Sequence, residues 1–111
     1  MLKKKFRLKK KSGFKEIFSK GRNYSSKYAA IYILKGPKRF GFIASKKIGN
    51  SVQRNRAKRL LREVIRLNLE NINNKVQIIF IARPKIKGVS YFEVEKSLLN
   101  MLKCANVFNE K

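Results

Sequence analysis

The sequence contains no histidine, no aspartate and no tryptophan, and it has a single cysteine, Cys104. Without histidine or aspartate the chain cannot build a Ser-His-Asp triad, and it has no His and Cys set for a zinc ion. A lone cysteine forms no disulfide within the chain, which fits a reducing compartment, and we expect Cys104 to be a small buried residue near a helix end. Any chemistry in which this chain takes part therefore needs reactive groups from elsewhere.

Negative charge is also scarce, because six glutamates stand against 29 lysines and arginines and the net charge is +23. A folded domain with this charge repels itself, so we expect a polyanionic partner. Nucleic acid is favoured over a membrane surface, because the apolar residues, 43% of the chain, are needed for a core. Glu93 and Glu95 are the only closely spaced acids, and we favour a structural role for them over a catalytic one.

Long apolar runs are absent. The first residues, MLKKKFRLKKK, have the charge of the start of a signal peptide, but no apolar stretch of about 7–15 residues follows them. No run approaches the roughly 20 apolar residues of a membrane-spanning helix. These patterns predict a cytoplasmic protein with no membrane partner. The length of 111 residues predicts one domain, residues 1–111, with a flexible basic segment at residues 1–11.

Hydrophobic periodicity predicts six elements. In chain order they are a helix at Gly13–Lys20, a strand at Lys27–Lys35, its hairpin partner at Arg39–Ser45 after the turn Gly36–Lys38, a helix from Val52 to about Leu69, a strand at Val76–Arg83 and a second long helix that Ser90 caps, with Glu93 completing a capping-box pattern. The fold class we expect is α/β, a two-layer sandwich with a sheet of three or four strands and helices packed on it.

The stretch SKKIGNSVQRNRAKRLLREVIR, residues 45–66, places eight lysines and arginines beside one acid, Glu63. Asn50 is a suitable N-cap, with Gln53 three residues later. At about 100° per residue, the apolar residues gather on one side of the predicted helix. They are Ala57, Leu60, Leu61, Val64, Ile65 and Leu67, while Asn55, Arg59, Arg62 and Arg66 face the other side, flanked by Arg54 and Lys58 and, opposite, by Arg56. The pattern predicts a stiff basic array suited to phosphates rather than a fluctuating tail.

Two further features suggest contacts with nucleic acid. The turn SKKIGN places Lys46 and Lys47 at a strand end, where backbone N–H groups at the helix N-terminus could meet an anion. Phe14 and Phe18 share one side of the first helix, and Tyr28 and Tyr32 are expected on one face of the next strand. These four rings form either a stacking platform for unpaired bases or part of the core, and spacing alone favours the core.

The stretch SKKIGNSVQRNRAKRLLRE resembles the protein subunit of bacterial ribonuclease P, whose signature is an Arg-Asn-Arg motif followed by a basic helix. The motif here is Arg54, Asn55 and Arg56, and Lys58, Arg59 and Arg62 complete it. The similarity extends to RLKKKSGFKEIFSKGR and to IIFIARP, so it spans about residues 7–105.

This resemblance implies an endoribonuclease subunit without catalytic residues or metal ligands of its own. The RNA subunit, with Mg²⁺ held mainly by that RNA and by substrate phosphates, would remove the 5′ leader of precursor tRNA, and the protein would broaden the substrate range. The resemblance also implies a left-handed strand-helix-strand crossover. The implied contacts to the RNA subunit are Lys46, Lys47, Asn50, Arg54, Asn55, Arg56, Lys58, Arg59, Arg62 and Arg66. The single-stranded leader would lie in a cleft lined by Phe14, Phe18, Tyr32, Lys46 and Lys47.

Two other functions fit the composition. A structural RNA-binding protein of the ribosomal kind would have the same charge, and only the Arg-Asn-Arg signature distinguishes it. A DNA-binding regulator would place the basic helix in a major groove and bind duplexes in a sequence-dependent way.

Overall fold

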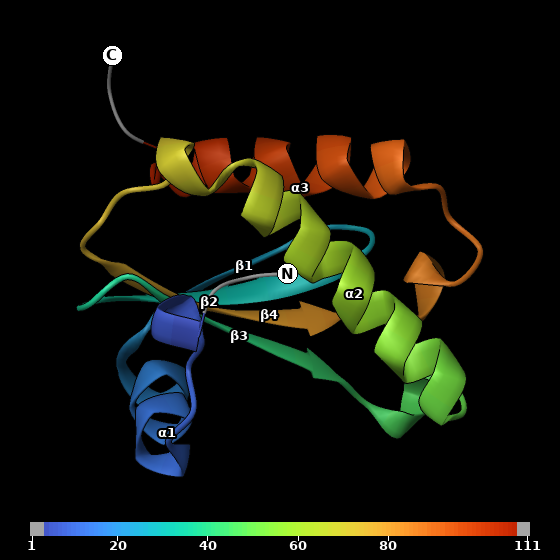
Figure 1. The fold of residues 1–111 in the computed structure, drawn as a ribbon, viewed down its shortest axis with the longest axis horizontal. Helices are drawn as coiled ribbons and strands as arrows, with labels where there is room; N and C mark the ends of the chain where they lie inside the picture. Colours follow the sequence, from blue (N-terminus) through green and yellow to red (C-terminus); the bar gives the residue numbers. More distant parts are fainter. Residues whose placement is uncertain (1–3, 109–111) are drawn as a thin grey trace.

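The computed structural model describes residues 4–108, which form a four-stranded sheet with helices on both faces (Figure 1). The elements are η1 (Lys4–Phe6), α1 (Lys11–Lys20), β1 (Arg22–Ser25), β2 (Ala29–Lys35), β3 (Arg39–Ala44), η2 (Lys46–Ile48), α2 (Ser51–Leu67), η3 (Leu69–Asn71), β4 (Val76–Ala82), η4 (Pro84–Ile86) and α3 (Tyr91–Cys104). The α/β class, the element order and the small sheet expected from the sequence are confirmed. The strand β1 was not predicted, because its four residues, RNYS, are mostly polar and exposed.

The predicted hairpin between β2 and β3 is wrong. The strand order is β1-β2-β4-β3, and β4 lies between them, antiparallel to β2 and parallel to β3. A central strand is buried on both faces and favours a continuous apolar run, which VQIIFIA supplies. Parallel strands need a long crossover, here α2. Seen from the helix side with both strands pointing up, β4 lies to the left of β3, which is the left-handed sense (Figure 1).

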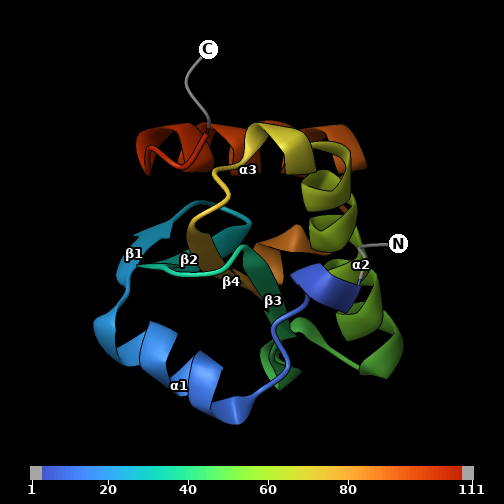
Figure 2. The same ribbon diagram turned by 60° about the vertical axis from the view of Figure 1, so that its left-hand side comes forward.

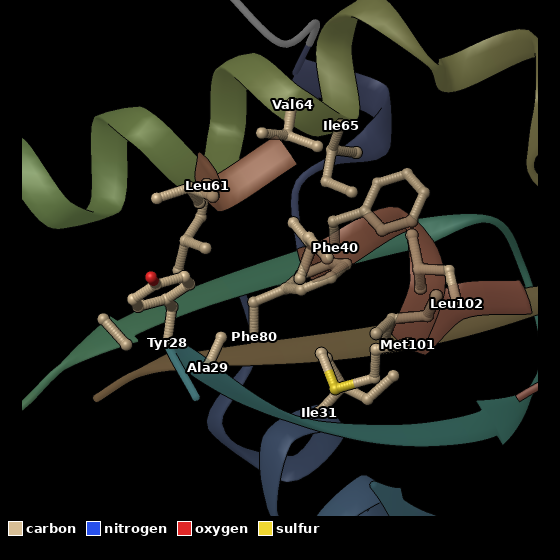
Figure 3. Packing of buried hydrophobic residues seen from close by; sticks show 14 of the residues in the cluster. Tyr28, Ala29, Ile31, Phe40, Leu61, Val64, Ile65, Phe80, Met101 and Leu102 are labelled. Atoms are coloured by element: carbon tan, nitrogen blue, oxygen red, sulfur yellow. The ribbon is translucent and has the colours of Figure 1, made fainter. Parts of the chain in front are cut away.

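The main core lies between the sheet and the layer formed by α2 and α3, and α1 crosses the opposite face (Figure 2). Along β2, Ala29, Ile31 and Ile33 alternate inward to this core. Figure 3 shows Phe40 and Phe80 of the sheet packed with Leu61, Val64 and Ile65 of α2 and with Met101 and Leu102 of α3. The basic helix is therefore fixed by its apolar side, as the periodicity predicted.

The helix ends agree closely with the sequence, but two residues near them are more exposed than predicted. Asn50 forms the predicted capping box, since its Oδ1 accepts from the Gln53 N–H at 3.0 Å and its own N–H donates to Gln53 Oε1 at 3.1 Å. Leu67, predicted on the apolar side, is 56% exposed because α2 ends there. Cys104 was expected to be buried but is exposed. At about 100° per residue it lies off the stripe through Met101 that packs on the core.

The N-terminal segment packs against the sheet. Phe6 lies against the core, and the Leu8 N–H donates to the Phe40 carbonyl at 2.8 Å, which extends the open edge of β3. The expected flexibility of residues 1–11 concerns motion and stays a prediction, and residues 1–3 lie outside the described part of the chain.

Candidate nucleic-acid interface

The polar side of α2 is an array of cations held at fixed positions. Asn55, Arg56, Arg59 and Arg66 are exposed, whereas Arg54, Lys58 and Arg62 are half-buried. The Arg62 guanidinium lies 5.7 Å from the centroid of the Phe42 ring, and Arg54 Nη2 donates to Ser51 Oγ at 3.1 Å. These contacts hold two guanidinium groups in place, so that fewer conformations are lost when phosphate binds.

Arg66 differs from the other cations of this face. Its Nε donates to Glu63 Oε2 at 3.0 Å, and a second guanidinium nitrogen pairs with the other carboxylate oxygen. Hydrogen bonding from Arg66 lowers the pKa of Glu63, and the same contact raises the pKa of Arg66. The charge of Arg66 is therefore neutralised locally, and we expect it to attract phosphate less than the arginines of the Arg-Asn-Arg motif.

Lys46 and Lys47 lie on η2, between the end of β3 and the start of α2, and both are exposed. The turn uses Gly49 at φ 141°, a conformation that disfavours other residues. The capping box already occupies the N–H groups of Asn50 and Gln53. An anion at this end of α2 would therefore depend on the two lysine side chains more than on the backbone donors proposed from the sequence.

The face of the sheet that α1 crosses carries three of the predicted aromatic residues. Phe18 and Tyr32 meet edge to face with their ring centroids 4.9 Å apart, and Phe18 is 39% exposed. The Phe14 ring lies over Gly41 of β3, where a Cβ atom would come within 2.6 Å of it. Phe14, Phe18 and Tyr32 thus gather on one face, away from α2.

Tyr28 does not join them, and its predicted place beside Tyr32 is wrong. It is 7% exposed in the main core, and its hydroxyl donates to Glu93 Oε2 of α3 at 3.0 Å. The alternation of β2 begins only at Ala29, so the shared parity of residues 28 and 32 does not place them on one face.

Beyond α1 the same face of the sheet continues as a shallow apolar floor. Ala30, Ile81 and Ile43 are neighbours across β2, β4 and β3, and all three are half-buried. Phe18 and Tyr32 stand on one side of this floor, and the strand ends that lead to Lys46 lie on the other. Sequence reasoning missed the floor, because its three residues become neighbours only when β4 lies between β2 and β3.

Other charged groups serve the fold. Lys38 Nζ donates to the carbonyls of Leu69 and Ile72 at 2.6 and 2.8 Å and to Asn74 Oδ1 at 3.2 Å, and desolvation lowers its pKa. Glu95 accepts from the Tyr91 hydroxyl at 2.9 Å; burial and this bond raise the pKa of Tyr91 to about 12.

Within residues 4–108 no group of three or more His, Cys, Asp or Glu side chains is arranged to hold a metal ion. No helix in that range has the length and apolar character that crossing a bilayer requires.

Comparison with known proteins identifies close relatives. A family described as Ribonuclease P matches residues 2–106. The ribonuclease P protein component of Clostridium novyi (strain NT) is 40% identical over 113 residues, which is 97% of this chain and 100% of the relative. A structure of a Staphylococcus aureus RNase P protein mutant with defective mRNA degradation activity matches with a TM-score of 0.85 at 34% identity, over 93% of this chain and 90% of the other. The RNase P protein from Thermotoga maritima matches at 0.80 and 30% identity, over 88% and 96%.

Proposed function

The chain belongs to the ribonuclease P protein family, and we propose that its two faces divide the work of that subunit. It assists the catalytic RNA in the endonucleolytic removal of the 5′ leader from precursor tRNA, and these two RNAs are its partners. One face binds the RNA subunit and the other binds the leader.

The RNA subunit binds α2 and the turn before it. The residues are Lys46, Lys47, Asn50, Arg54, Asn55, Arg56, Lys58, Arg59, Arg62 and Arg66, of which Arg66 contributes least because of Glu63. Arginine forks donate paired hydrogen bonds to phosphate oxygens, and each neutralised phosphate releases counterions. A contact with about six phosphates gives a slope of roughly −4 to −5 in log K against log salt.

The leader lies on the opposite face, over the apolar floor. Its bases stack on Phe14, Phe18 and Tyr32, and such contact tolerates many sequences because every base can stack on an aromatic ring. Its phosphates approach Lys46 and Lys47 at the strand ends. This sequence tolerance supports a broad range of substrates.

The hydrolytic chemistry belongs to RNA and Mg²⁺. Mg²⁺ keeps several waters and binds well to phosphate oxygens, so the RNA subunit and the substrate can supply its ligands. The protein screens phosphate charge and holds the leader, which raises substrate affinity and eases metal binding. We assign no catalytic residue to the chain, and we place it in the cytoplasm, where transcripts are processed.

The observation that carries the proposal is the position of Lys46 and Lys47. They lie between the end of β3, a strand of the sheet whose one face carries the aromatic residues, and the start of the basic helix α2. The experiment mixes the purified chain with transcribed RNA subunit and precursor tRNA at low Mg²⁺. We expect leader removal to be faster than with RNA alone. No gain would favour a structural RNA-binding protein of the ribosomal kind, and sequence-dependent duplex binding would favour a DNA-binding regulator.

A further inference from the structure

Four cations come together at the end of the sheet that lies opposite η2. Lys20 ends α1, Arg22 begins β1, Lys35 ends β2 and Lys75 directly precedes β4. The end of β3 that leads to η2 is paired with the end of β4, whereas Lys35 is paired with the first residue of β4. The four cations line a hollow of about 650 Å³, here called the rear basin, together with residues that include Asn73 and Asn106. None of the described residues that line it is acidic.

The backbone that carries these cations is held in place. The Gly36 N–H donates to the Lys75 carbonyl at 3.0 Å, which joins the end of β2 to the start of β4. The Arg22 guanidinium lies 5.9 Å from the centroid of the Tyr24 ring. Cations at fixed positions suit phosphate, because they lose fewer conformations on binding and because arginine and lysine both donate to phosphate oxygens.

The helix α1 separates the rear basin from the apolar floor on which we place the leader. The floor begins at Ala30, near the start of β2, and Lys35 lies about 17 Å farther along the same strand. Between these two positions Phe18 of α1 packs on Tyr32. A leader on the floor would have to pass over α1 to reach the rear basin, so the location favours a different RNA segment.

The basic helix connects the RNA subunit with this end of the sheet. The 17 residues of α2 extend about 25 Å, from η2 toward the strand ends beside the rear basin (Figure 1). The charge of Arg66, in the last turn of α2, is neutralised by Glu63, and residues 68–74 include no lysine or arginine. The rear basin is therefore a separate cationic surface and does not continue the array on α2.

We propose that the rear basin binds phosphates of a second segment of the RNA subunit. One protein molecule then contacts two separate segments of that RNA, the first along α2 and the second at the opposite end of the sheet. The proposal rests on the proposed function and extends it, since a protein that binds both segments fixes the distance between them and so favours one folded arrangement of the RNA subunit.

The first test reverses two charges of the rear basin, as Lys35→Glu with Lys75→Glu. The matched control reverses two exposed charges of α3, as Lys96→Glu with Lys103→Glu. Binding of the RNA subunit is measured over a range of salt concentrations without precursor tRNA, so that no leader is present. We expect the rear-basin variant to lose on the order of tenfold in affinity and to flatten the salt slope by about 1.5, because two phosphate contacts are lost. The control should change the affinity by less than about twofold.

The second test locates the RNA directly and keeps the other basin cations in place. An iron chelate that generates hydroxyl radicals is attached at Lys35→Cys or at Val52→Cys, which is 76% exposed at the start of α2, each in a Cys104→Ser background. With the full holoenzyme and precursor tRNA, we expect the two positions to cut different segments of the RNA subunit.

An unchanged affinity of the rear-basin variant, or an equal loss in the control, would overturn the proposal. It would also be overturned if the chelate at position 35 cut only the leader, or cut no RNA. The proposed function has its own readout, because unmodified protein that accelerates leader removal supports it whichever result the rear basin gives.

Discussion

Replacing Gly41 by alanine should displace Phe14 without removing it. An added Cβ would lie 2.6 and 2.8 Å from two carbons of the Phe14 ring, whereas carbon atoms pack at about 3.5–4.0 Å. The ring must therefore move by roughly 1 Å. Overpacking of this kind costs about 1–3 kcal/mol, and alanine regains about 0.5–1 kcal/mol over glycine in a strand. We expect the free energy of unfolding to fall by up to about 2 kcal/mol.

The same shift should weaken leader binding. Stacking of one base on an aromatic ring is worth about 1–3 kcal/mol, and a loss of about 1 kcal/mol lowers the affinity about fivefold. The assay compares holoenzyme affinity for precursor tRNA and for leaderless tRNA. Only the affinity for precursor tRNA should fall. Assembly with the RNA subunit should be unaffected, because α2 packs on the other face of the sheet.

A double-mutant cycle tests the cause. In a Phe14→Ala background the clash is gone, so Gly41→Ala should no longer reduce leader affinity. If Gly41→Ala weakened leader binding equally with and without the Phe14 ring, the reasoning would be refuted. A similar loss of affinity for leaderless tRNA would refute it as well.

Three other predictions concern different parts of the molecule. Changing Arg54, Arg56 and Arg59 to alanine should weaken assembly with the RNA subunit and flatten its salt slope by about 2, measured as binding between low and moderate salt. Lys38→Met should lower the free energy of unfolding by about 2–3 kcal/mol in urea denaturation, because half-buried carbonyls lose their donor. Tyr91 should ionise near pH 12, so the stability that its hydrogen bond provides is complete below about pH 10 and is lost as the pH rises toward 12, which ultraviolet titration of the phenol checks.

Each of these three predictions can be contradicted by a specific result. A triple arginine variant with an unchanged salt slope would place RNA binding elsewhere. Lys38→Met with wild-type stability would mean that water replaces the ammonium group at the carbonyls. For the phenol, Tyr91→Phe is the control, since it should remove the group that ionises near pH 12, and a titration curve that keeps its late step in this variant would contradict the assignment.

Local features of the sequence were sufficient to predict the basic helix. The apolar stripe of α2 repeats within a few residues, and the Asn50 cap bonds to Gln53 three positions away. The i,i+3 spacing of Glu63 and Arg66 is also a local feature of the sequence, and the two residues form an ion pair. A count of lysines and arginines therefore overstates the positive charge available to RNA phosphates on this helix.

Strand pairing was not predictable in the same way. Adjacent strands with a turn between them favour a hairpin, but the strongly apolar β4 arrives later in the chain and takes the place beside β2. The apolar floor of Ala30, Ile81 and Ile43 depends on that nonlocal pairing. Tyr28 was misplaced because the alternation of β2 starts one residue after it.

The claim that RNA carries out the cleavage is tested most directly by removing it. The protein is treated with nuclease until no nucleic acid remains, the nuclease is inactivated, and precursor tRNA is added with Mg²⁺. We predict no cleavage at the mature 5′ end until transcribed RNA subunit is supplied, and then rapid leader removal. Accurate cleavage by the RNA-free protein would contradict the account.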